Sequence, residues 1–379
     1  MNFDLTEEQI AVQLAAREFA QTELLPGVIE RDTHQKFPAE QIKKMGALGF
    51  MGMMVDPKYN GGGMDTISYV LAMEEISKID ASVSVCMSVN NSLVCWGIER
   101  FGTEEQKEKY LKKLATGESI GAFCLSEPEA GSDATSQRTT AEDKGDYYLL
   151  NGTKNWITNG SSASVYLVIA QTHPEKKHKG INALIVERGM QGFVVGKKED
   201  KMGIRGSDTH SLMFTDVKVP KKNRIGDEGF GFTFAMTTLN GGRIGIASQA
   251  LGISSGAYEL ALKYAKERKA FGKHLTEHQA IQFKLADMAT KIDAARLLIW
   301  QAASLKDQKK DFVKAAAMAK LYASQIAQEV TTEAVQIHGG YGYVKEFHVE
   351  RMMRDAKITQ IYEGTTEIQK MVISRELLR

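Results

Sequence analysis

The chain has 379 residues, 43% of them hydrophobic, and is therefore long enough for two or three globular domains with sizeable cores. Lysine and arginine total 48 against 47 acidic residues, a formal net charge of +1, without a basic block or a basic stripe with interleaved aromatic residues. This balance argues against electrostatic binding to nucleic acid and favours small molecules or proteins as partners.

Residues 1–118 are predicted to form an N-terminal helical domain. From Thr6 the segment TEEQIAVQLAAREFAQTELL repeats apolar residues at intervals of three and four, and TEEQKEKYLKKLATGE opens with Thr103, a common helix cap. The N-terminus lacks an apolar signal core, and no run approaches the roughly 18 apolar residues of a membrane span. The three cysteines have no CxxC spacing and lie among apolar residues, which favours reduced thiols. We therefore expect a soluble, cytoplasmic protein that does not bind a membrane.

Residues 119–228 are predicted to form a middle β domain. The segments VYLVIAQ, NALIVERG and MFTDVKVP alternate apolar and polar residues or run apolar, as strands do. Asn151-Gly152 and Asn159-Gly160 are dipeptides typical of hairpin turns.

Residues 229–379 are predicted to form a C-terminal helical bundle. All six prolines lie at or before residue 220, and the remainder is rich in Ala, Leu, Ile, Gln, Lys and Glu, which favour long helices.

Some familiar motifs occur only in an unsuitable context. GISSG, residues 252–256, has the pattern of a nucleophile elbow, but it lies inside a continuous helical pattern, which favours close helix packing over a catalytic Ser254. The clusters NGGGMD, GDEGFGF and GGYGY lack the full spacing of a dinucleotide or P-loop motif. His274 and His278 have no third ligand at metal-binding spacing, so no metal is predicted.

Five other stretches form a candidate site when they are taken together. FCLSEPEAGSDATS, from Phe123, ends a strand-like run in a turn of small polar groups, and NWITNG, from Asn155, puts Trp and Thr beside a turn. Both are suited to line a flat polar heterocycle. ERKAFGKHLTEHQAIQFKLADM and AVQIHGGYGY add an arginine, a glutamine and a Gly-Gly pair where a backbone can approach a ligand closely. IYEGTTEIQ places Glu363 between Tyr362 and Gly364.

Each of these residues also has a simpler interpretation when it is taken alone. Trp156 would then be a core residue, Arg268 a solvated charge, Gly339-Gly340 a helix C-cap and Glu363 an exposed loop acid.

In their order along the chain, these stretches closely resemble the acyl-CoA dehydrogenase family, and most closely its short-chain, butyryl-type members. The likeness covers essentially the whole chain. It implies an α+β, mostly α fold, with an N-terminal helical domain, a middle β-barrel or sandwich-like domain and a C-terminal four-helix bundle. It also implies FAD as cofactor, FAD sites shared between subunits of a homotetramer built as a dimer of dimers, and electron-transfer flavoprotein as electron acceptor.

The resemblance also assigns roles to individual residues. FAD is expected to contact Phe123, Cys124, Leu125, Ser126, Glu127, Gly131, Ser132, Trp156, Ile157 and Thr158. FAD of a neighbouring subunit is expected to contact Arg268, Phe271, Gln279, Gln336, Ile337, His338, Gly339 and Gly340. A helix that begins at a Thr366–Gln369 capping box is expected to present its N-terminal end, with Thr365, Thr366 and Glu367, to FAD oxygens. The acyl-CoA thioester is expected to contact Ser132, Asn240, Gly241, Gly242, Arg243 and Gly364.

By the same resemblance, Glu363 is the base that takes the α-proton of the thioester while the β-hydride passes to flavin N5, which leaves a trans-2-enoyl-CoA. A carboxylate with an ordinary pKa of about 4.3 is a weak base, so an apolar setting, provided by Tyr362 and the acyl chain, is expected to raise that pKa. Some branches of the family carry the base instead on the helix around LNGGRIG, where the resemblance matches their position to Gly242, which has no side chain. Asn240 replaces an aspartate that is common in relatives.

The sequence leaves alternative activities open. The first is an acyl-CoA dehydrogenase for straight or for branched short chains, and the second is an acyl-CoA oxidase, whose reduced flavin reacts with oxygen. A non-catalytic helical protein that binds acyl-CoA is the alternative from another class.

Overall fold

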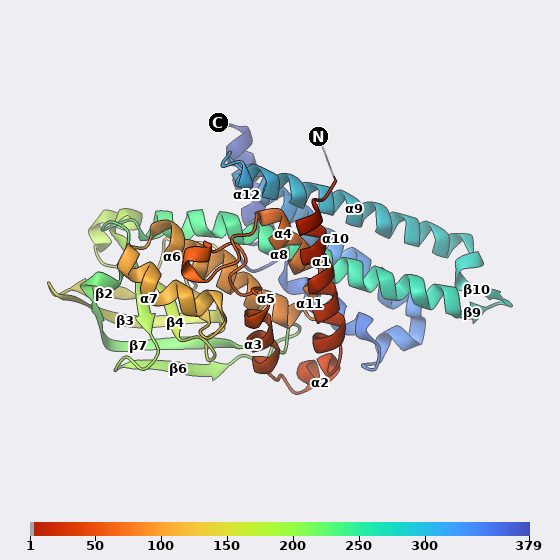
Figure 1. Ribbon diagram of the computed structural model, residues 1–379, viewed down its shortest axis with the longest axis horizontal. Helices are drawn as coiled ribbons and strands as arrows, with labels where there is room; N and C mark the ends of the chain where they lie inside the picture. The colour runs from red at the N-terminus through yellow and green to blue at the C-terminus, as the bar shows by residue number, and fades with distance from the viewer. Residues whose placement is uncertain (1–3) are drawn as a thin grey trace.

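The computed structural model describes residues 4–379. Along the chain, a group of helices comes first, then a β-sheet, then a second group of helices (Figure 1). The N-terminal part consists of α1 (Glu7–Phe19), η1 (Ala20–Leu24), α2 (Val28–Thr33), α3 (Ala39–Ala47), η2 (Pro57–Tyr59), α4 (Thr66–Ser77), α5 (Ala81–Ser88), η3 (Val89–Cys95), α6 (Trp96–Phe101) and α7 (Glu104–Ala115). Thr103 caps α7 as predicted, and Thr6 caps α1 in the same way, each through a capping box with a glutamine three residues later.

The helical run Ala81–Phe101 is the central core element of this part. By length and composition it is apolar enough to cross a membrane, but 94% of its apolar window is buried inside the protein. Its polar groups are also satisfied by protein: the amide nitrogen of Asn90 donates to the Met51 carbonyl at 2.7 Å, and that of Asn91 donates to the Phe50 carbonyl at 2.8 Å. The run therefore packs against protein, as the core helix of a globular domain does.

The middle part is one curved sheet that surrounds a core of its own. Its strands are β1 (Gly121–Cys124), β2 (Thr140–Asp143), β3 (Tyr147–Thr158), β4 (Val165–Gln171), β5 (Ile181–Glu187), β6 (Phe193–Lys198), β7 (Thr209–Pro220) and β8 (Arg224–Ile225). The order across the sheet is β6-β7-β3-β2-β4-β5-β8, with β1 parallel to β4. Alternate residues of β4 face the helices or a second cluster that includes Tyr166, Val168 and Phe214. Both faces of β4 are therefore buried, which accounts for its unbroken apolar sequence.

The two dipeptides expected to form hairpin turns behave differently from that expectation. Asn151-Gly152 lies inside β3, where a β-bulge shifts the register against β7, so this turn prediction was wrong. Gly152 is required there because a Cβ would lie 2.6 Å from Thr139 Oγ1. Asn159 does begin a turn, with φ 63°, but the strands on either side of it are not neighbours, because β2 separates β3 from β4.

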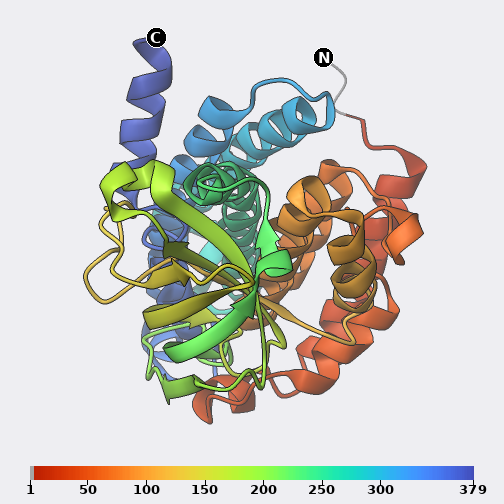
Figure 2. The same cartoon turned by 90° about the vertical axis from the view of Figure 1, so that its left-hand side faces the viewer.

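The C-terminal part is built on long helices, which confirms the expected helical, β, helical order. Its elements are α8 (Gly231–Glu267), β9 (Lys269–Ala270), β10 (Lys273–His274), η6 (Leu275–Glu277), α9 (Gln279–Asp307), α10 (Val313–His338), η7 (Gly339–Tyr343), α11 (His348–Ile358) and α12 (Thr366–Leu377). Figure 2, which looks at the sheet end of the molecule, shows α12 protruding beyond the body of the protein.

The GISSG segment packs one helix against another, as its context predicted. It lies within α8, and the buried Ser254 hydroxyl donates to the Ala250 carbonyl at 2.7 Å. A Cβ at Gly252 would lie 2.4 Å from the Glu74 carbonyl oxygen, and a Cβ at Gly256 would lie 2.4 Å from that of Lys78. The two glycines therefore allow α4 to approach α8 closely.

Candidate active site

Glu363 lies in the turn that joins α11 to α12, on a backbone conformation that side-chain-bearing residues rarely adopt. Its φ is 51°, and that of Gly364 is 92°. Such a conformation at a non-glycine residue costs on the order of 1–3 kcal/mol and persists only where its surroundings hold it. The amide nitrogen of Gln369 supplies part of that hold, since it donates to the carbonyl oxygens of Glu363 at 3.3 Å and Gly364 at 2.8 Å.

The predicted capping box at Thr366–Gln369 was therefore wrong by one position. The N-cap is Thr365, whose hydroxyl accepts from the Ile368 N–H. No capping box forms, because the residue three positions after Thr365 is Ile368, which has no polar side chain, while the side-chain amide nitrogen of Gln369 bonds to the preceding turn. Thr366 is instead the first residue of α12, and Glu367 is exposed in the first turn.

The carboxylate of Glu363 points at the backbone of α8. A Cβ built on Gly242 would lie 2.1 Å from Glu363 Oε2 and 2.7 Å from Leu93 Cδ2, so the carboxylate and Leu93 share the space above this glycine. Within residues 4–379, Oε2 is buried and has no hydrogen-bond partner. Burial raises the pKa of Glu363 to about 7, and the positive charges of Lys320 and Arg243 oppose that rise. An unpartnered oxygen with this pKa is suited to accept a proton near neutral pH.

Tyr362 contributes to the placement of Glu363 from the other side of the turn. Its hydroxyl donates to Oε1 of Gln249 in α8, and the amide nitrogen of Gln249 donates in turn to the Ala81 carbonyl at 2.8 Å. Tyr362 was expected to provide an apolar wall for the carboxylate. The structure gives it an anchoring hydrogen bond, and places Leu93 beside the carboxylate.

Arg243 and Asn240 form a pair one helical turn apart on α8. Arg243 is only 5% exposed, and its Nη1 donates to Asn240 Oδ1 at 2.6 Å. Burial lowers the pKa of Arg243 to about 10, which the negative charge of Glu363 opposes. Gly242 and Arg243 thus lie where α8 meets Glu363, and Asn240, which Arg243 contacts, keeps its hydrogen bonding without a charge. A Cβ on Gly241 would instead lie 3.9 Å from Lys306 Nζ and from the Ser92 carbonyl oxygen.

Lys320 belongs to the same group, and reasoning from the sequence missed it. It lies on α10, its side chain is fully buried, and its Nζ donates to the Gly364 carbonyl at 2.6 Å. Burial lowers the pKa of Lys320 to about 7. Its position in the sequence could have indicated that it is buried, because Lys320 interrupts an apolar helical stripe, four residues after the buried Ala316 and three before the buried Ala323.

The residues expected to hold FAD within one subunit gather at the ends of β1 and β3. Trp156 is 61% exposed with φ 61°, so its interpretation as a core residue was wrong. Gly131 and Ser132 are exposed in the loop after β1, and the ring of Phe123 stacks on Phe234, with ring centroids 6.3 Å apart. Leu125, Ser126 and Thr158 are half-buried nearby.

Three of these expected contacts have side chains that are already committed to the protein. Cys124 and Ile157 belong to the inner core of the sheet. The buried carboxylate of Glu127 accepts from Lys154 Nζ at 2.7 Å and from the Arg138 N–H at 2.6 Å. These residues can therefore meet a cofactor only through their backbone groups, while the Glu127–Lys154 pair fixes the start of the loop after β1.

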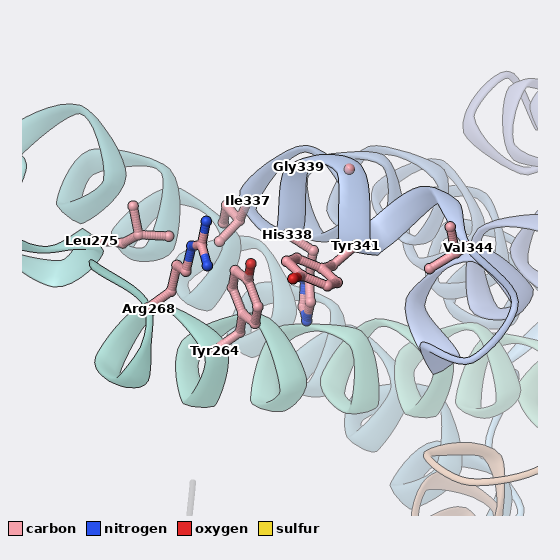
Figure 3. A pocket seen from close by; sticks show the side chains of 9 residues that line it. Tyr264, Arg268, Leu275, Ile337, His338, Gly339, Tyr341 and Val344 are labelled. Atoms are coloured by element: carbon pink, nitrogen blue, oxygen red, sulfur yellow. The ribbon is translucent and has the colours of Figure 1, made fainter. Parts of the chain in front are cut away.

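A second group of predicted residues surrounds a pocket of about 470 Å³ where α8 and α10 end. Figure 3 shows Tyr264, Arg268 and Leu275 on one side and Ile337, His338, Gly339 and Tyr341 on the other. The rings of Tyr264 and His338 stack with centroids 4.4 Å apart, and the Arg268 guanidinium lies 5.7 Å from the centroid of the Tyr341 ring. Gly339 ends α10 with φ 59°, which confirms its interpretation as a helix C-cap.

This pocket is open, and most of the predicted residues around it are exposed, whereas Ile337 and His338 are each only 5% exposed. A Cβ on Gly339 or Gly340 would meet nothing within 4 Å. Gln279 and Gln336 are exposed at the ends of α9 and α10, and Phe271, at the tip of the β9–β10 hairpin, is 96% exposed. A single chain thus leaves a cationic and aromatic surface uncovered at this end.

The two groups of residues predicted to bind FAD do not meet within one chain. The sheet that carries Trp156 and the β9–β10 hairpin beside Arg268 lie at opposite ends of the long axis of the molecule (Figure 1). Glu363 reaches α8 between these ends, at Gly242.

Comparison with known proteins finds matches over nearly the whole chain. Models of the acyl-CoA dehydrogenase N-terminal, middle and C-terminal domains match residues 6–118, 122–217 and 229–378. The short-chain specific acyl-CoA dehydrogenase of Clostridium acetobutylicum is 50% identical over 379 residues, which cover 100% of both chains.

Two solved structures cover 100% of this chain and are themselves covered completely. Butyryl-CoA dehydrogenase from Megasphaera elsdenii is 51% identical with a TM-score of 0.99. A chain solved in work on the electron transferring flavoprotein of Acidaminococcus fermentans and flavin-based electron bifurcation is 53% identical, also with a TM-score of 0.99.

Proposed function

Because the chain belongs to the acyl-CoA dehydrogenase family, we propose that it oxidises short-chain acyl-CoA thioesters, such as butyryl-CoA, to trans-2-enoyl-CoA, with Glu363 as the base. The observation that carries this proposal is the Glu363 carboxylate itself. Its Oε2 is buried and unpartnered within the described residues, its pKa is raised to about 7 by burial, and it faces a helix position that has no side chain. These features suit removal of an α-proton from a bound thioester.

The residues around Glu363 are proposed to hold it in position for this proton transfer. Gln369 and Lys320 hold the turn, Tyr362 anchors it to α8, and Leu93 helps to keep water from the carboxylate. The Glu363 N–H is proposed to donate to the thioester oxygen, which makes the α-carbon more acidic. Ser132, Asn240, Gly241, Gly242, Arg243 and Gly364 are the proposed substrate contacts.

The chain offers a fitting site for FAD, whose flavin when bound accepts the β-hydride. The exposed indole of Trp156 beside the Gly131–Ser132 loop fits a flat ring, and the Arg268 cation beside the open backbone of Gly339 and Gly340 fits phosphate oxygens. Because these two groups lie at opposite ends of one chain, we propose that each FAD is shared by two subunits.

The remaining features of the proposal follow from the family. We propose a homotetramer built as a dimer of dimers, electron transfer to an electron-transfer flavoprotein, and a cytoplasmic location. The domain boundaries after residues 118 and 228 stay a prediction. The first falls between the end of α7 at Ala115 and the start of β1 at Gly121, and the second between the end of β8 at Ile225 and the start of α8 at Gly231.

The experiment that tests the proposal is reduction of the purified protein by acyl-CoA. We expect a yellow protein whose flavin absorbance bleaches without air on addition of butyryl-CoA. A panel from propionyl-CoA to octanoyl-CoA, with isobutyryl-CoA and 2-methylbutyryl-CoA, tests the preference for straight short chains. A colourless protein, or a yellow one that no member of the panel bleaches, would contradict the proposal. Rapid re-oxidation by oxygen would instead indicate an acyl-CoA oxidase.

A further inference from the structure

We propose that Lys320 is a positioning residue for the reaction: its ammonium group holds the turn that presents the Glu363 carboxylate, and its charge favours the ionised carboxylate. This inference rests on the proposed function, because it concerns how the proposed base is held and tuned. It adds a residue from α10 to a site that the sequence motifs place on α8 and on the turn before α12.

The contact between Lys320 and the turn is short and enclosed. Lys320 is fully buried, and its Nζ donates at 2.6 Å to the Gly364 carbonyl, the same oxygen that receives the Gln369 amide at 2.8 Å. Burying an ammonium group costs several kcal/mol unless it is compensated. A leucine or methionine at this place in the apolar stripe of α10 would fill the space without that cost. The cation is therefore retained for what it bonds to and for its charge.

The choice of acceptor matters for the chemistry. Lys320 binds the carbonyl oxygen of the residue that follows the base, while Oε2 of Glu363 stays without a partner among the described residues. A hydrogen bond from Lys320 to the carboxylate oxygen would occupy the position that must receive the proton. By binding the neighbouring carbonyl, Lys320 fixes the backbone next to the strained position of Glu363 and leaves the base free.

The charged groups around the carboxylate set the direction of the electrostatic effect. Lys320 and Arg243 lower the pKa of Glu363, and burial, which is the largest effect, raises it. For Lys320, burial lowers the pKa, Glu363 and Glu367 oppose this, and Arg243 adds to it. The hydroxyls of Tyr69 and Tyr362, the other titratable groups that interact with Glu363, have pKa values raised by burial and stay neutral. Loss of the Lys320 charge therefore raises the pKa of Glu363.

The test compares Lys320→Met, which keeps the length of the side chain but loses the donor and the charge, with Lys320→Gln, which keeps a donor. The control is Lys78→Met, since Lys78 is another largely buried lysine, paired with Glu75 and Glu259 away from the site. The measurements are kcat and KM for butyryl-CoA across pH, the thermal midpoint, and titration of the Glu363 carboxyl by difference infrared spectroscopy against Glu363→Gln.

For Lys320→Met we expect kcat at neutral pH to fall about tenfold or more with a smaller change in KM, and the acid limb of kcat/KM and the infrared titration to move up by about one pH unit. Lys320→Gln should show the same shift with a smaller loss of kcat, and Lys78→Met should lower the thermal midpoint alone. If both Lys320 variants keep the wild-type titration and kcat while losing stability, Lys320 is only structural and the inference is wrong. If Lys320→Met does not fold, Lys320→Gln decides. Wild-type protein that no acyl-CoA reduces would refute the proposed function itself.

Discussion

The carboxylate of Glu363 occupies the space that a side chain at Gly242 would fill. A Cβ on Gly242 would lie 2.1 Å from Glu363 Oε2, although the two residues belong to α8 and to the turn before α12. Two distant segments of the sequence therefore meet at one point, where one supplies the acid and the other supplies the room for it. The placement of the carboxylate therefore depends on the absence of a side chain at Gly242 as well as on Glu363 itself.

The first prediction concerns this room. Gly242→Ala is expected to fold normally, because the atoms that its methyl group meets, Glu363 Oε2 and Leu93 Cδ2, are the ends of flexible side chains. The carboxylate must move, however, and displacement of a base by about 1 Å can cost on the order of 10²-fold in rate. We expect at least a tenfold lower kcat for butyryl-CoA at an unchanged thermal midpoint. Gly241→Ala should lose less, since its methyl group meets nothing closer than 3.9 Å; equal losses in both variants would argue against the displacement.

The second prediction concerns pH and stability. The folded protein raises the pKa of Glu363 from 4.5 to about 7, so the protonated group stabilises the fold at low pH. That contribution is fully present below pH 4.5 and is lost as the pH rises through 7. Glu363→Gln cannot ionise and escapes this loss, so we expect it to be more stable than wild type by about 1–3 kcal/mol at pH 8 and similar to it at about pH 5. Denaturant unfolding at both pH values, with excess FAD, measures the difference. A variant that is no more stable than wild type at pH 8 would show that folding does not raise the pKa of the Glu363 carboxyl.

The third prediction concerns the pocket at the end of α8. If Arg268 serves the FAD of a neighbouring subunit, Arg268→Ala should lose FAD and dissociate together, because ligand binding and assembly are then coupled. The flavin-to-protein absorbance ratio and sedimentation velocity measure the two effects. Lys266→Ala, which removes another exposed cation two residues earlier, in the last turn of α8, is the control and should change neither. Full FAD occupancy in a monomeric Arg268→Ala protein would contradict a shared site.

The fourth prediction concerns Trp156. Because its side chain is 61% exposed, Trp156→Ala should change the free energy of unfolding by no more than about 0.5 kcal/mol, as exposed substitutions usually do. We expect a shifted flavin absorbance spectrum or a slower reduction by butyryl-CoA. Val194→Ala, at a 52% exposed position on β6, is the comparison and should leave the spectrum unchanged. A large loss of stability with a normal spectrum would show that Trp156 stabilises the fold and does not contact the flavin.

The sequence predicted the order of helices and strands because each depends on local periodicity. It predicted Glu363 through a compact motif, which resemblance to a family can recognise. Lys320 escaped notice because its role depends on α10 packing against the turn before α12, which no local pattern records. Asn151-Gly152 was misread for a related reason: the glycine is needed for close contact with Thr139, the residue just before β2, and this requirement looks the same in sequence as a turn. The cap of α12 was misplaced by one residue because Thr365 and Thr366 are adjacent and threonine is a common cap, and the sequence pattern alone does not distinguish them.

The last prediction tests the assignment of the base. Glu363→Gln should retain the shape of the side chain and bind FAD and acyl-CoA, but lose α-proton removal, with a rate penalty of at least the 10²- to 10⁴-fold typical of a general base. Butyryl-CoA turnover and anaerobic flavin bleaching measure the loss. A Glu363→Gln protein that turns over at close to the wild-type rate would show that another group removes the proton.

Two further variants, Glu363→Gly and Glu363→Gly combined with Gly242→Glu, test whether the carboxylate can come from α8 instead. In Glu363→Gly the space above Gly242 is freed, so Gly242→Glu in that background no longer meets the Glu363 carboxylate. Its Cβ would lie 2.1 Å from the position that Glu363 Oε2 occupies in the wild type. The requirement is only that a carboxylate reach the same α-proton, so the double variant should regain part of the activity that Glu363→Gly loses. Recovery should be incomplete, because Leu93 Cδ2 lies 2.7 Å from the new Cβ and the longer side chain must displace it. If Glu363→Gln is inactive and the double variant regains nothing, Glu363 remains the base, and the error lies in taking Gly242 as the equivalent origin.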